Sequence, residues 1–452
     1  MTSSARPVSG SPRDYHFPSF TRHALRNGLK VVIAPVKKLP VVTVLAVVDA
    51  GAIADPRGKE GLAQLTAEAL REGTSLHNGI EILEGFERLG SSFEAGSDWD
   101  STVLSMTVLS NQLTKALPLF VEVLRFPSFP VNEIERLKAE RLAERLQVLL
   151  EPRALADESL SRVVYEDGSR YSKPLAGNTT AISAITHADV VRFFNSHYTS
   201  GAVTMIITGD IDTTSALEQV ESVLGDWQGV QDFSGSTKVQ ESGKSRVVEI
   251  TAKPDAAQAE LRLGHIGIPR SHPDYFSVVV MNAVLGGLFS SRINLNLREK
   301  HGYTYGASSF YDWRRNPGPF VIATAVQSEI TADAIRETLL EVDGMRNSVI
   351  SSDELSLATS YLEGVFPIRY ETTSAIASAL ANLVIFDLPE NYYDEYRRNI
   401  HEVSPSDVLK AAQAHIHPEK LRIVVVGDPK LLTEPIEKLK LGSVSVRPPA
   451  EA

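Results

Sequence analysis

The side chains that could do chemistry in this chain are nitrogen and oxygen donors, because its 452 residues include no cysteine. A thiolate nucleophile, a disulfide framework and a cysteine-type zinc site are excluded, so any metal would need His, Asp or Glu. His415 and His417 are close enough in sequence to bind one metal, but no third ligand is evident. His197 and His415 each lie on an apolar helix stripe, where a hydrogen-bonded core histidine is more frequent than a metal ligand.

Signature motifs of several enzyme classes are absent from the sequence. It has no phosphate-binding glycine loop, no Gly-x-Ser-x-Gly elbow, and neither His-Glu-x-x-His nor His-x-x-Glu-His. P-loop enzymes, serine hydrolases of the nucleophile-elbow type and self-sufficient zincins therefore lose support.

An arginine and a tyrosine flank a predicted helix-to-strand corner in the second half. We expect the helix to carry Arg298 and His301 in its last turn and to end at Gly302 as a left-handed C-cap. A strand over Tyr303–Trp313 follows, with Tyr305 on its alternating face. By themselves, the arginine could simply neutralise the helix end and the tyrosine could pack on a neighbour.

Two segments resemble the insulinase/pitrilysin-type peptidases, also called inverzincins. Asp55–Thr74 is similar to the zinc-site helix of that family, in which Gly-Leu-Ala precedes His-x-x-Glu-His and Gly-Thr follows. Leu285–Ser309 is similar to the family's Leu-Gly-Gly-Gly-x-Ser-Ser-Arg…Leu-Arg-Glu-Lys-x-Gly-x-x-Tyr stretch. The resemblance covers most of residues 20–445, and Asn27–Ile33 looks like the family's opening strand.

The resemblance implies that the zinc motif has degenerated in this chain. The two histidines of the motif fall on Gln64 and Glu68, and the catalytic glutamate falls on Ala67. The third ligand, a glutamate on a later helix, falls on Glu144, although a solvated helix carboxylate is an equally good interpretation of that residue. The helical period places Gln64, Ala67, Glu68 and Arg71 on one face, away from the expected buried face. Amide and carboxylate donors disfavour tight zinc binding, and alanine cannot act as a general base.

The same resemblance gives Arg298 and Tyr305 a catalytic role across a domain interface. In the family this pair reaches the zinc site of a facing domain. A guanidinium can hold a substrate carbonyl or carboxylate, and a tyrosine hydroxyl can stabilise the oxyanion formed in peptide hydrolysis.

A substrate-binding edge strand is also implied by the resemblance. Leu89–Thr102 looks like the family's substrate-lining segment, and we expect Glu94, Ala95, Gly96 and Ser97 to bind an extended peptide by strand addition. Glu94 stands where the family pattern usually has asparagine.

The chain contains an internal repeat that defines its architecture. Residues 186–210 match residues 404–428 without a gap at an offset of 218, since Thr186 aligns with Ser404 and Gly209 with Gly427. Each copy is expected to be a helix, with Thr186 or Ser404 as N-cap, followed by a strand. Strand-like runs cluster rather than alternating strictly with helices. We therefore predict an α+β fold of two homologous halves, each an antiparallel-rich sheet backed by helices.

The expected domains follow from this repeat and from a polar, Gly/Ser-containing stretch between the halves. We expect a flexible tail over 1–19, a first insulinase-like domain over 20–228, a linker over 229–246, a second domain over 247–445 and a tail over 446–452.

Composition limits partners and location. The net charge of −11 argues against nucleic acid as the main partner. The most apolar stretch, Val41–Val48, contains one threonine and is far too short for a membrane span. Met1–Asp14 lacks the apolar run of a secretory signal, so we expect a cytoplasmic protein, with the periplasm left open.

The leading functional hypothesis is a zinc-less partner subunit of a heterodimeric insulinase-type metallopeptidase. This chain would bind no cofactor, while a homologous His-x-x-Glu-His subunit would carry the zinc and act with it on peptide substrates. The alternative is a catalytically inert structural or peptide-binding protein of the same fold. A homodimeric hydrolase that uses Glu68, Glu144 and another metal is the third possibility.

Overall fold

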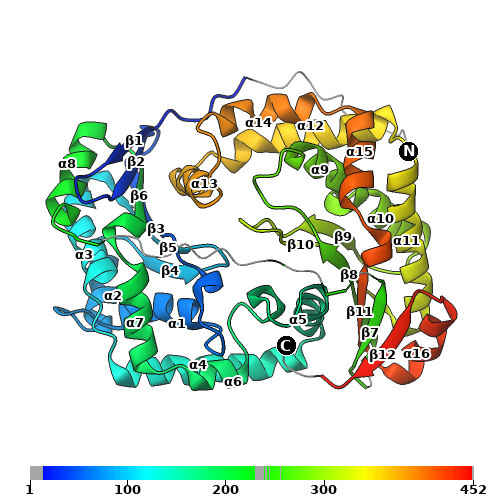
Figure 1. Cartoon of the computed structure of the whole chain (residues 1–452). Helices are drawn as coiled ribbons and strands as arrows, with labels where there is room; N and C mark the ends of the chain where they lie inside the picture. The colour runs from blue at the N-terminus through cyan, green and yellow to red at the C-terminus, as the bar shows by residue number, and fades with distance from the viewer. Residues whose placement is uncertain (1–13, 230–238, 240–241, 244, 255, 450–452) are drawn as a thin grey trace, which may run out of the picture.

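The computed structural model describes residues 14–229, 239, 242–243, 245–254 and 256–449. Most of the linker expected over 229–246 lies outside these residues, as do 1–13 and 450–452 of the expected tails. Figure 1 shows the described chain as two groups of strands, one at each side of the molecule, with most helices on the outside.

Two six-stranded sheets form the framework of the two halves. The first has the order β1-β2-β6-β3-β5-β4, and only β2 and β6 pair in parallel. The second has the order β12-β7-β11-β8-β10-β9, and β7 pairs in parallel with both β11 and β12. The strands of the first sheet are β1 (Thr21–Ala24), β2 (Lys30–Pro35), β3 (Val41–Val48), β4 (Phe93–Ser97), β5 (Thr102–Leu109) and β6 (Val203–Gly209). Those of the second are β7 (Val247–Ala252), β8 (Gln258–Ile266), β9 (Ala307–Tyr311), β10 (Pro319–Gln327), β11 (Arg422–Gly427) and β12 (Ser443–Arg447).

The internal repeat seen in the sequence is confirmed in the arrangement of strands. The order β2-β6-β3-β5-β4 recurs as β7-β11-β8-β10-β9 with the same relative directions. The repeated helices both begin with capping boxes, Thr186 with Asp189 and Ser404 with Asp407. These reciprocal hydrogen bonds satisfy N–H groups that the first helical turn would otherwise leave unpaired. The α+β prediction, with antiparallel-rich sheets backed by helices, is therefore confirmed.

Helices cover both sheets. In the first half they are α1 (Leu62–Ala69), α2 (Gly79–Arg88), α3 (Leu113–Arg125), α4 (Val131–Leu150), α5 (Pro152–Val164), α6 (Thr179–Ala184), α7 (His187–His197) and α8 (Thr213–Leu224). In the second they are α9 (Tyr275–Asn282), α10 (Arg292–Asn294), α11 (Thr331–Asn347), α12 (Ser352–Arg369), α13 (Thr373–Ile385), α14 (Tyr392–His401), α15 (Pro405–His415) and α16 (Pro429–Lys438).

The two halves exchange one helix each. Helix α5, which follows α4 in the first half, packs on β8 and β11 of the second sheet. Helix α13, which follows α12 in the second half, packs on β3 and β6 of the first sheet. Both helices lie toward the middle of the molecule in Figure 1. Each sheet is thus covered on its inner face by a helix from the other half.

Apolar side chains hold α5 against the second sheet. Leu160 and Val164 belong to a buried cluster that also contains Val424 and Val426 of β11. Gly264 of β8 leaves room for this contact, because a Cβ there would lie 3.0 Å from Leu160 Cδ2 and 2.6 Å from the Phe320 carbonyl oxygen. The close approach of helix and strand therefore depends on a glycine at that position.

Threonine hydroxyls anchor the start of α13 to the first sheet. Thr43 of β3 and Thr373 share a hydrogen bond of 3.0 Å between their hydroxyl oxygens. The Thr208 hydroxyl donates to the Thr373 carbonyl oxygen at 2.8 Å. Thr43 and Thr208 are both buried, and the Thr43 hydroxyl also shares a hydrogen bond of 2.9 Å with that of Thr107, so α13 joins a polar network already present in the sheet.

Several expectations about local structure need correction. The strand predicted over Tyr303–Trp313 is shorter, β9 covering only Ala307–Tyr311, so Tyr305 lies in the preceding loop. Ala67, expected on the face of α1 that points away from the core, is fully buried.

One helical stretch, Tyr275–Lys300, is long and apolar enough to cross a membrane by composition, but 56% of its apolar window is buried inside the fold, as in the core helix of a globular protein.

The exchanged helix α5 should be a major source of stability. We expect Leu160→Ala to lower the free energy of unfolding by about 2–5 kcal/mol, because it opens a cavity between α5 and the second sheet. Leu146→Ala, on the exposed side of α4, is the matched control and should change it by less than about 0.5 kcal/mol. Urea denaturation followed by circular dichroism measures both, and equal effects would contradict the importance of the exchange.

Candidate functional site

The start of α1 is fixed by a buried carboxylate. Asp55 accepts hydrogen bonds from the backbone N–H groups of Gly61 at 2.8 Å and Ala63 at 2.7 Å. Arg170 donates to the same carboxylate at 2.9 Å and also binds carbonyl oxygens of Pro174 and Leu175. Burial raises the pKa of Asp55 to about 6, so the group is ionised at neutral pH. This network sets the position from which α1 presents Gln64 and Glu68.

A guanidinium group occupies the polar face of α1. Arg141 of α4 donates to Gln64 Oε1 at 3.0 Å and, through Nε, to Glu68 Oε2 at 2.9 Å. A second guanidinium nitrogen pairs with Glu68 Oε1, so the contact with the carboxylate is bidentate. The Arg141 side chain is only 9% exposed. The two positions onto which the resemblance maps the zinc-binding histidines are therefore bridged by a guanidinium cation.

The residues present do not fit a zinc ion. The Gln64 amide nitrogen donates a hydrogen bond to the Ser97 carbonyl oxygen, and the Gln64 amide oxygen accepts one from Arg141. Both polar atoms of this side chain are therefore already engaged. Glu144, the position aligned with the third ligand, lies on the exposed side of α4, whereas Arg141 faces α1. A hydrophobic methyl group, that of Ala67, takes the place of a general base. No hydrolytic step can be assigned to this helix.

The predicted peptide-binding strand is an edge strand. β4 is the last strand of the first sheet, and among the described residues it pairs only with β5. Glu94 and Gly96 are exposed, Ala95 is half-buried and Ser97 is buried. Strand β4 is also linked to α1, because the Ser97 carbonyl oxygen accepts the hydrogen bond from Gln64 at 3.2 Å. An open strand edge thus lies directly beside the degenerate metal motif.

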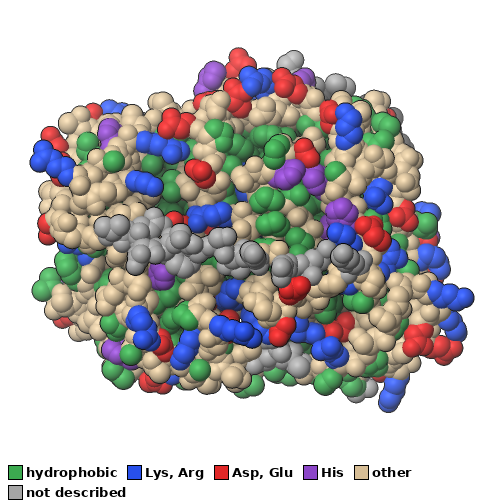
Figure 2. All heavy atoms as spheres, in the orientation of Figure 1, with side chains coloured by type: hydrophobic (Ala, Val, Ile, Leu, Met, Phe, Trp, Pro, Cys, Tyr) green, Lys and Arg blue, Asp and Glu red, His purple; other side chains and the backbone are tan. Residues whose placement is uncertain are grey.

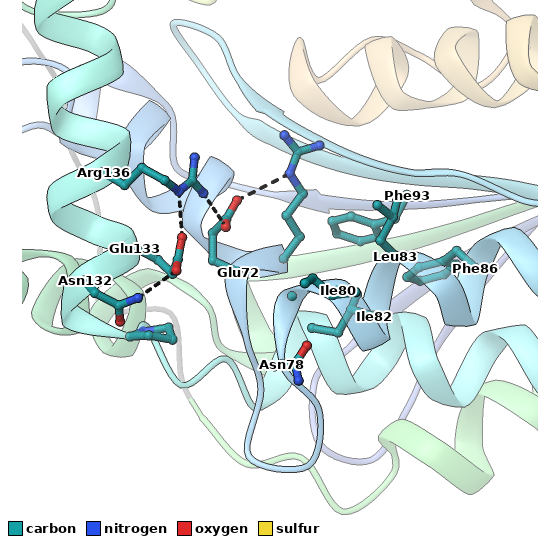
Figure 3. Close-up of a pocket in the computed structure, with 13 residues that line it drawn as sticks. Glu72, Asn78, Ile80, Ile82, Leu83, Phe86, Phe93, Asn132, Glu133 and Arg136 are labelled. Atoms are coloured by element: carbon teal, nitrogen blue, oxygen red, sulfur yellow. Dashed lines mark hydrogen bonds and ion pairs between the residues drawn. The ribbon is translucent and has the colours of Figure 1, made fainter.

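A cavity of about 780 Å³ adjoins this edge. Figure 3 shows its two contrasting walls: Arg136 pairs with Glu72 and Glu133 on one side, and apolar side chains line the other. The apolar wall consists of Ile80, Ile82, Leu83 and Phe86 of α2 with Phe93 of β4. Ile80 is 71% exposed and Leu83 57% exposed. Exposed apolar side chains in a concave surface are typical of a site that binds apolar groups.

Arg298 is held beside an exposed aromatic ring. It lies near the end of the π-helical segment Leu295–Lys300, and Gly302 beyond it has the predicted left-handed conformation with φ of 66°. The guanidinium carbon lies 4.4 Å from the centre of the Phe289 ring, and Nη1 lies 3.6 Å from Glu299. This Nη1 is buried and has no hydrogen bond among the described residues.

Tyr305 is presented to solvent. Its side chain is 94% exposed, the highest value among the exposed large hydrophobic and aromatic residues of the described chain. It lines a cavity of about 560 Å³ together with Arg262 of β8 and with Arg153 and Asp157 of the exchanged helix α5. The contacts of the described residues connect neither Arg298 nor Tyr305 with Gln64 or Glu68.

The sequence reasoning missed Arg141, although a signal for it exists. Ile134, Leu137, Arg141 and Arg145 are the buried residues of α4 and follow a helical period. An arginine at an otherwise apolar position needs a buried anionic partner. Glu68, on a helix already expected to face the same site, is that partner.

Basic and acidic side chains are intermixed over the face drawn in Figure 2. This face has no large patch of basic side chains of the kind that binds nucleic acid, in keeping with the net charge of −11.

Comparison with known proteins identifies the family. The model described as "Insulinase (Peptidase family M16)" matches residues 30–178, and that described as "Peptidase M16 inactive domain" matches residues 184–362. The chain belongs to the insulinase family of M16 peptidases, as the resemblance of its motifs indicated.

Relatives in this family are named both as zinc proteases and as a non-peptidase homolog. An uncharacterized zinc protease YmxG of Bacillus subtilis is 24% identical and aligns over 78% of this chain and 85% of its own length. A non-peptidase homolog YmxG of Helicobacter pylori is 23% identical, over 84% of this chain and 87% of its own. A solved M16 inactive domain from Pseudomonas fluorescens superposes with a TM-score of 0.84 at 26% identity and covers 91% of this chain and 98% of that one.

The Arg141 bridge should contribute measurably to stability. We expect Arg141→Met to lower the free energy of unfolding by about 1–2 kcal/mol, since hydrogen bonds to charged groups are worth roughly 1.5–3 kcal/mol and the one-third-exposed Glu68 can recover some hydration. Arg71→Met, which changes a side chain that is 56% exposed, should have little effect. Chemical denaturation of both variants is the measurement, and an unchanged Arg141→Met protein would show that the bridge is not formed.

Proposed function

We propose that this chain is the zinc-less subunit of a two-chain M16 peptidase, supplying Arg298 and Tyr305 to substrate bound at the zinc site of a homologous subunit. The supporting observation is the contrast between its two motifs. Arg141 bridges the two positions onto which the resemblance maps the zinc-binding histidines. Arg298 Nη1, by contrast, has an ion pair of 3.6 Å with Glu299 and no hydrogen bond within the described chain, and Tyr305 is almost fully exposed.

The chemistry proposed for the pair follows from its side chains. The Arg298 side chain is 34% exposed, and its guanidinium could donate hydrogen bonds to a substrate carbonyl or carboxylate oxygen. An exposed tyrosine hydroxyl can donate to the oxyanion that forms when a partner-bound water attacks a peptide bond. Burying Tyr305 at a subunit interface would also remove its unfavourable exposure to water.

Peptides are the substrate class that the first half supports. The free side of β4 offers main-chain hydrogen bonds to an extended chain, independent of its sequence. The adjoining cavity can take an apolar side chain of that peptide against Leu83 and Phe93. Binding in this chain and hydrolysis at the partner would then be separate steps, with zinc as the partner's cofactor.

Peptide binding by this chain alone is the first test. We expect a fluorescent extended peptide with an apolar residue to bind without being cleaved, and Leu83→Glu to weaken the affinity about tenfold by placing a charge on the apolar wall. Leu146→Glu introduces the same charge at a similarly exposed leucine of α4 and should have no effect. Fluorescence anisotropy measures both, and equal affinities for the two variants would remove the cavity from the site.

Reconstitution tests the catalytic role. Mixing the purified chain with a family member that has an intact His-x-x-Glu-His motif should produce peptide hydrolysis absent from either protein alone. Arg298→Ala or Tyr305→Phe should lower kcat/KM of the mixture by about 10²-fold or more, because each removes a donor to the developing charge. Tyr361→Phe, at another exposed tyrosine, is the matched control.

The outcomes separate the proposed functions. Full activity in both Arg298→Ala and Tyr305→Phe would overturn the catalytic role even if a complex forms. Peptide binding that persists without turnover, whatever subunit is added, would instead favour the inert peptide-binding protein. Complex formation should be followed by size-exclusion chromatography in every case, so that lost assembly is not taken for lost chemistry.

A further inference from the structure

Three potential metal ligands that are far apart in the sequence meet in the second half. His272 and Asp274 lie just before α9, and His415 is the last residue of α15. His415 Nε2 lies 2.6 Å from Asp274 Oδ2, and His272 Nδ1 lies 3.9 Å from the same oxygen. One ligand atom from each residue falls within 4.8 Å of the other two.

The fold rearranges the histidine pair that the sequence suggested. His417, two residues after His415, turns toward His265 instead, and the two rings have centres 5.3 Å apart. The backbone N–H of His417 donates to His265 Nε2 at 3.1 Å. His415 therefore has a different pair of companions, Asp274 and His272, which complete the set of three that the sequence lacked.

The two side chains ahead of α9 are oriented in a way that suits a metal. Asp274 is the N-cap residue of α9, yet its carboxylate makes no capping hydrogen bond within the described chain and points to His415. His272 Nδ1 accepts the backbone N–H of Asp274 at 3.1 Å, so this nitrogen is unprotonated, and a metal ion bound there would replace that hydrogen bond. The C-terminal end of α15, where His415 lies, favours a positive charge.

We propose that His272 Nδ1, Asp274 Oδ2 and His415 Nε2 form a binding site for a divalent late first-row metal ion, with Zn²⁺ as the best match. Two imidazole nitrogens and one carboxylate oxygen are ligands that Zn²⁺ accepts at about 2.0–2.2 Å, with a solvent molecule in the fourth position. Tetrahedral ligands at these bond lengths lie about 3.4 Å from one another. His272 Nδ1 must therefore move toward Asp274 Oδ2, and His415 Nε2 must move slightly away from it.

Limited burial allows the ligand side chains to make these movements. The side chains of His272 and Asp274 are 31% and 49% exposed, so both can rotate without disturbing the core. His415 is 12% exposed and is held by α15, which packs on α9. A bound ion would tie the loop before α9 to the end of α15. It would also revise the expectation that this chain itself binds no cofactor.

The site is independent of the proposed peptidase role. It lies between α9 and α15 of the second half and shares no residue with α1, β4, Arg298 or Tyr305. A negative result here would leave the reconstitution experiment untouched, and the reverse also holds.

Metal titration of the full chain tests the proposal. The protein, with any polyhistidine tag removed and stripped by a chelator, is titrated with ZnCl₂ against a chromophoric competitor and separately with CoCl₂ for its visible spectrum. We expect one equivalent to bind, a tetrahedral Co²⁺ absorption band, and a rise in the melting temperature with added Zn²⁺. His272→Asn, Asp274→Asn and His415→Gln should each weaken the affinity tenfold or more.

A matched control comes from another histidine beside a carboxylate. His401 Nδ1 lies 3.1 Å from Glu363 Oε1, so His401→Gln should leave the Zn²⁺ affinity unchanged. Asp274→Asn keeps a residue suited to an N-cap and serves if His415→Gln does not fold. Absence of binding, or an equivalent of Zn²⁺ that persists in His272→Asn and Asp274→Asn, would overturn the proposal and leave His415 and Asp274 as a simple hydrogen-bonded pair.

Discussion

The exchange of α5 and α13 between the two halves is the constraint on which the rest of the structure depends. Neither sheet can bury its inner face with the helices of its own half alone, because the covering helix comes from the other half. Polar contacts reinforce the exchange, with Arg262 of β8 donating to Asp157 of α5 at 2.5 Å. The halves repeat one another in topology, yet we infer that they fold and unfold as one body rather than as two independent domains.

Contacts between the two halves also extend to the segment that holds the start of α1. Arg170, which holds the Asp55 carboxylate at the start of α1, lies over the ring of Trp99 at 5.2 Å. Arg314, from the turn between β9 and β10, lies over the same ring at 4.1 Å. The position of α1 is therefore connected through one indole ring to the second sheet.

The sequence predicts features that depend on neighbouring residues better than features that depend on which strands and helices lie side by side. The repeat, the capping boxes and Gly302 were predictable because each depends on residues a few positions apart. The start of β9 was not, because alternation continues through Tyr303 and Tyr305 although the sheet offers them no neighbouring strand.

The contacts that define the candidate sites depend on tertiary structure. Arg141 and Glu68 meet because α4 crosses α1, and Asp274 meets His415 because α15 packs on α9. Periodicity indicates that a face is buried, but it does not say which element covers it. The partner of a buried charge can be inferred to exist from one sequence; its identity has to be found in the fold.

Arg141 adds a positive charge at the face of α1 where the resemblance places the metal motif, in addition to the replacement of the metal ligands. The Glu68 carboxylate, one-third exposed, is neutralised by a guanidinium that is itself almost fully buried. The same guanidinium opposes any metal. At about 4 Å and an effective dielectric constant of about 20, a divalent ion and a unit positive charge repel by roughly 8 kcal/mol. That is a large part of the roughly 10–16 kcal/mol available to a complete structural zinc site. With Gln64 and Glu68 holding Arg141 in place, this repulsion disfavours a metal ion at the face of α1.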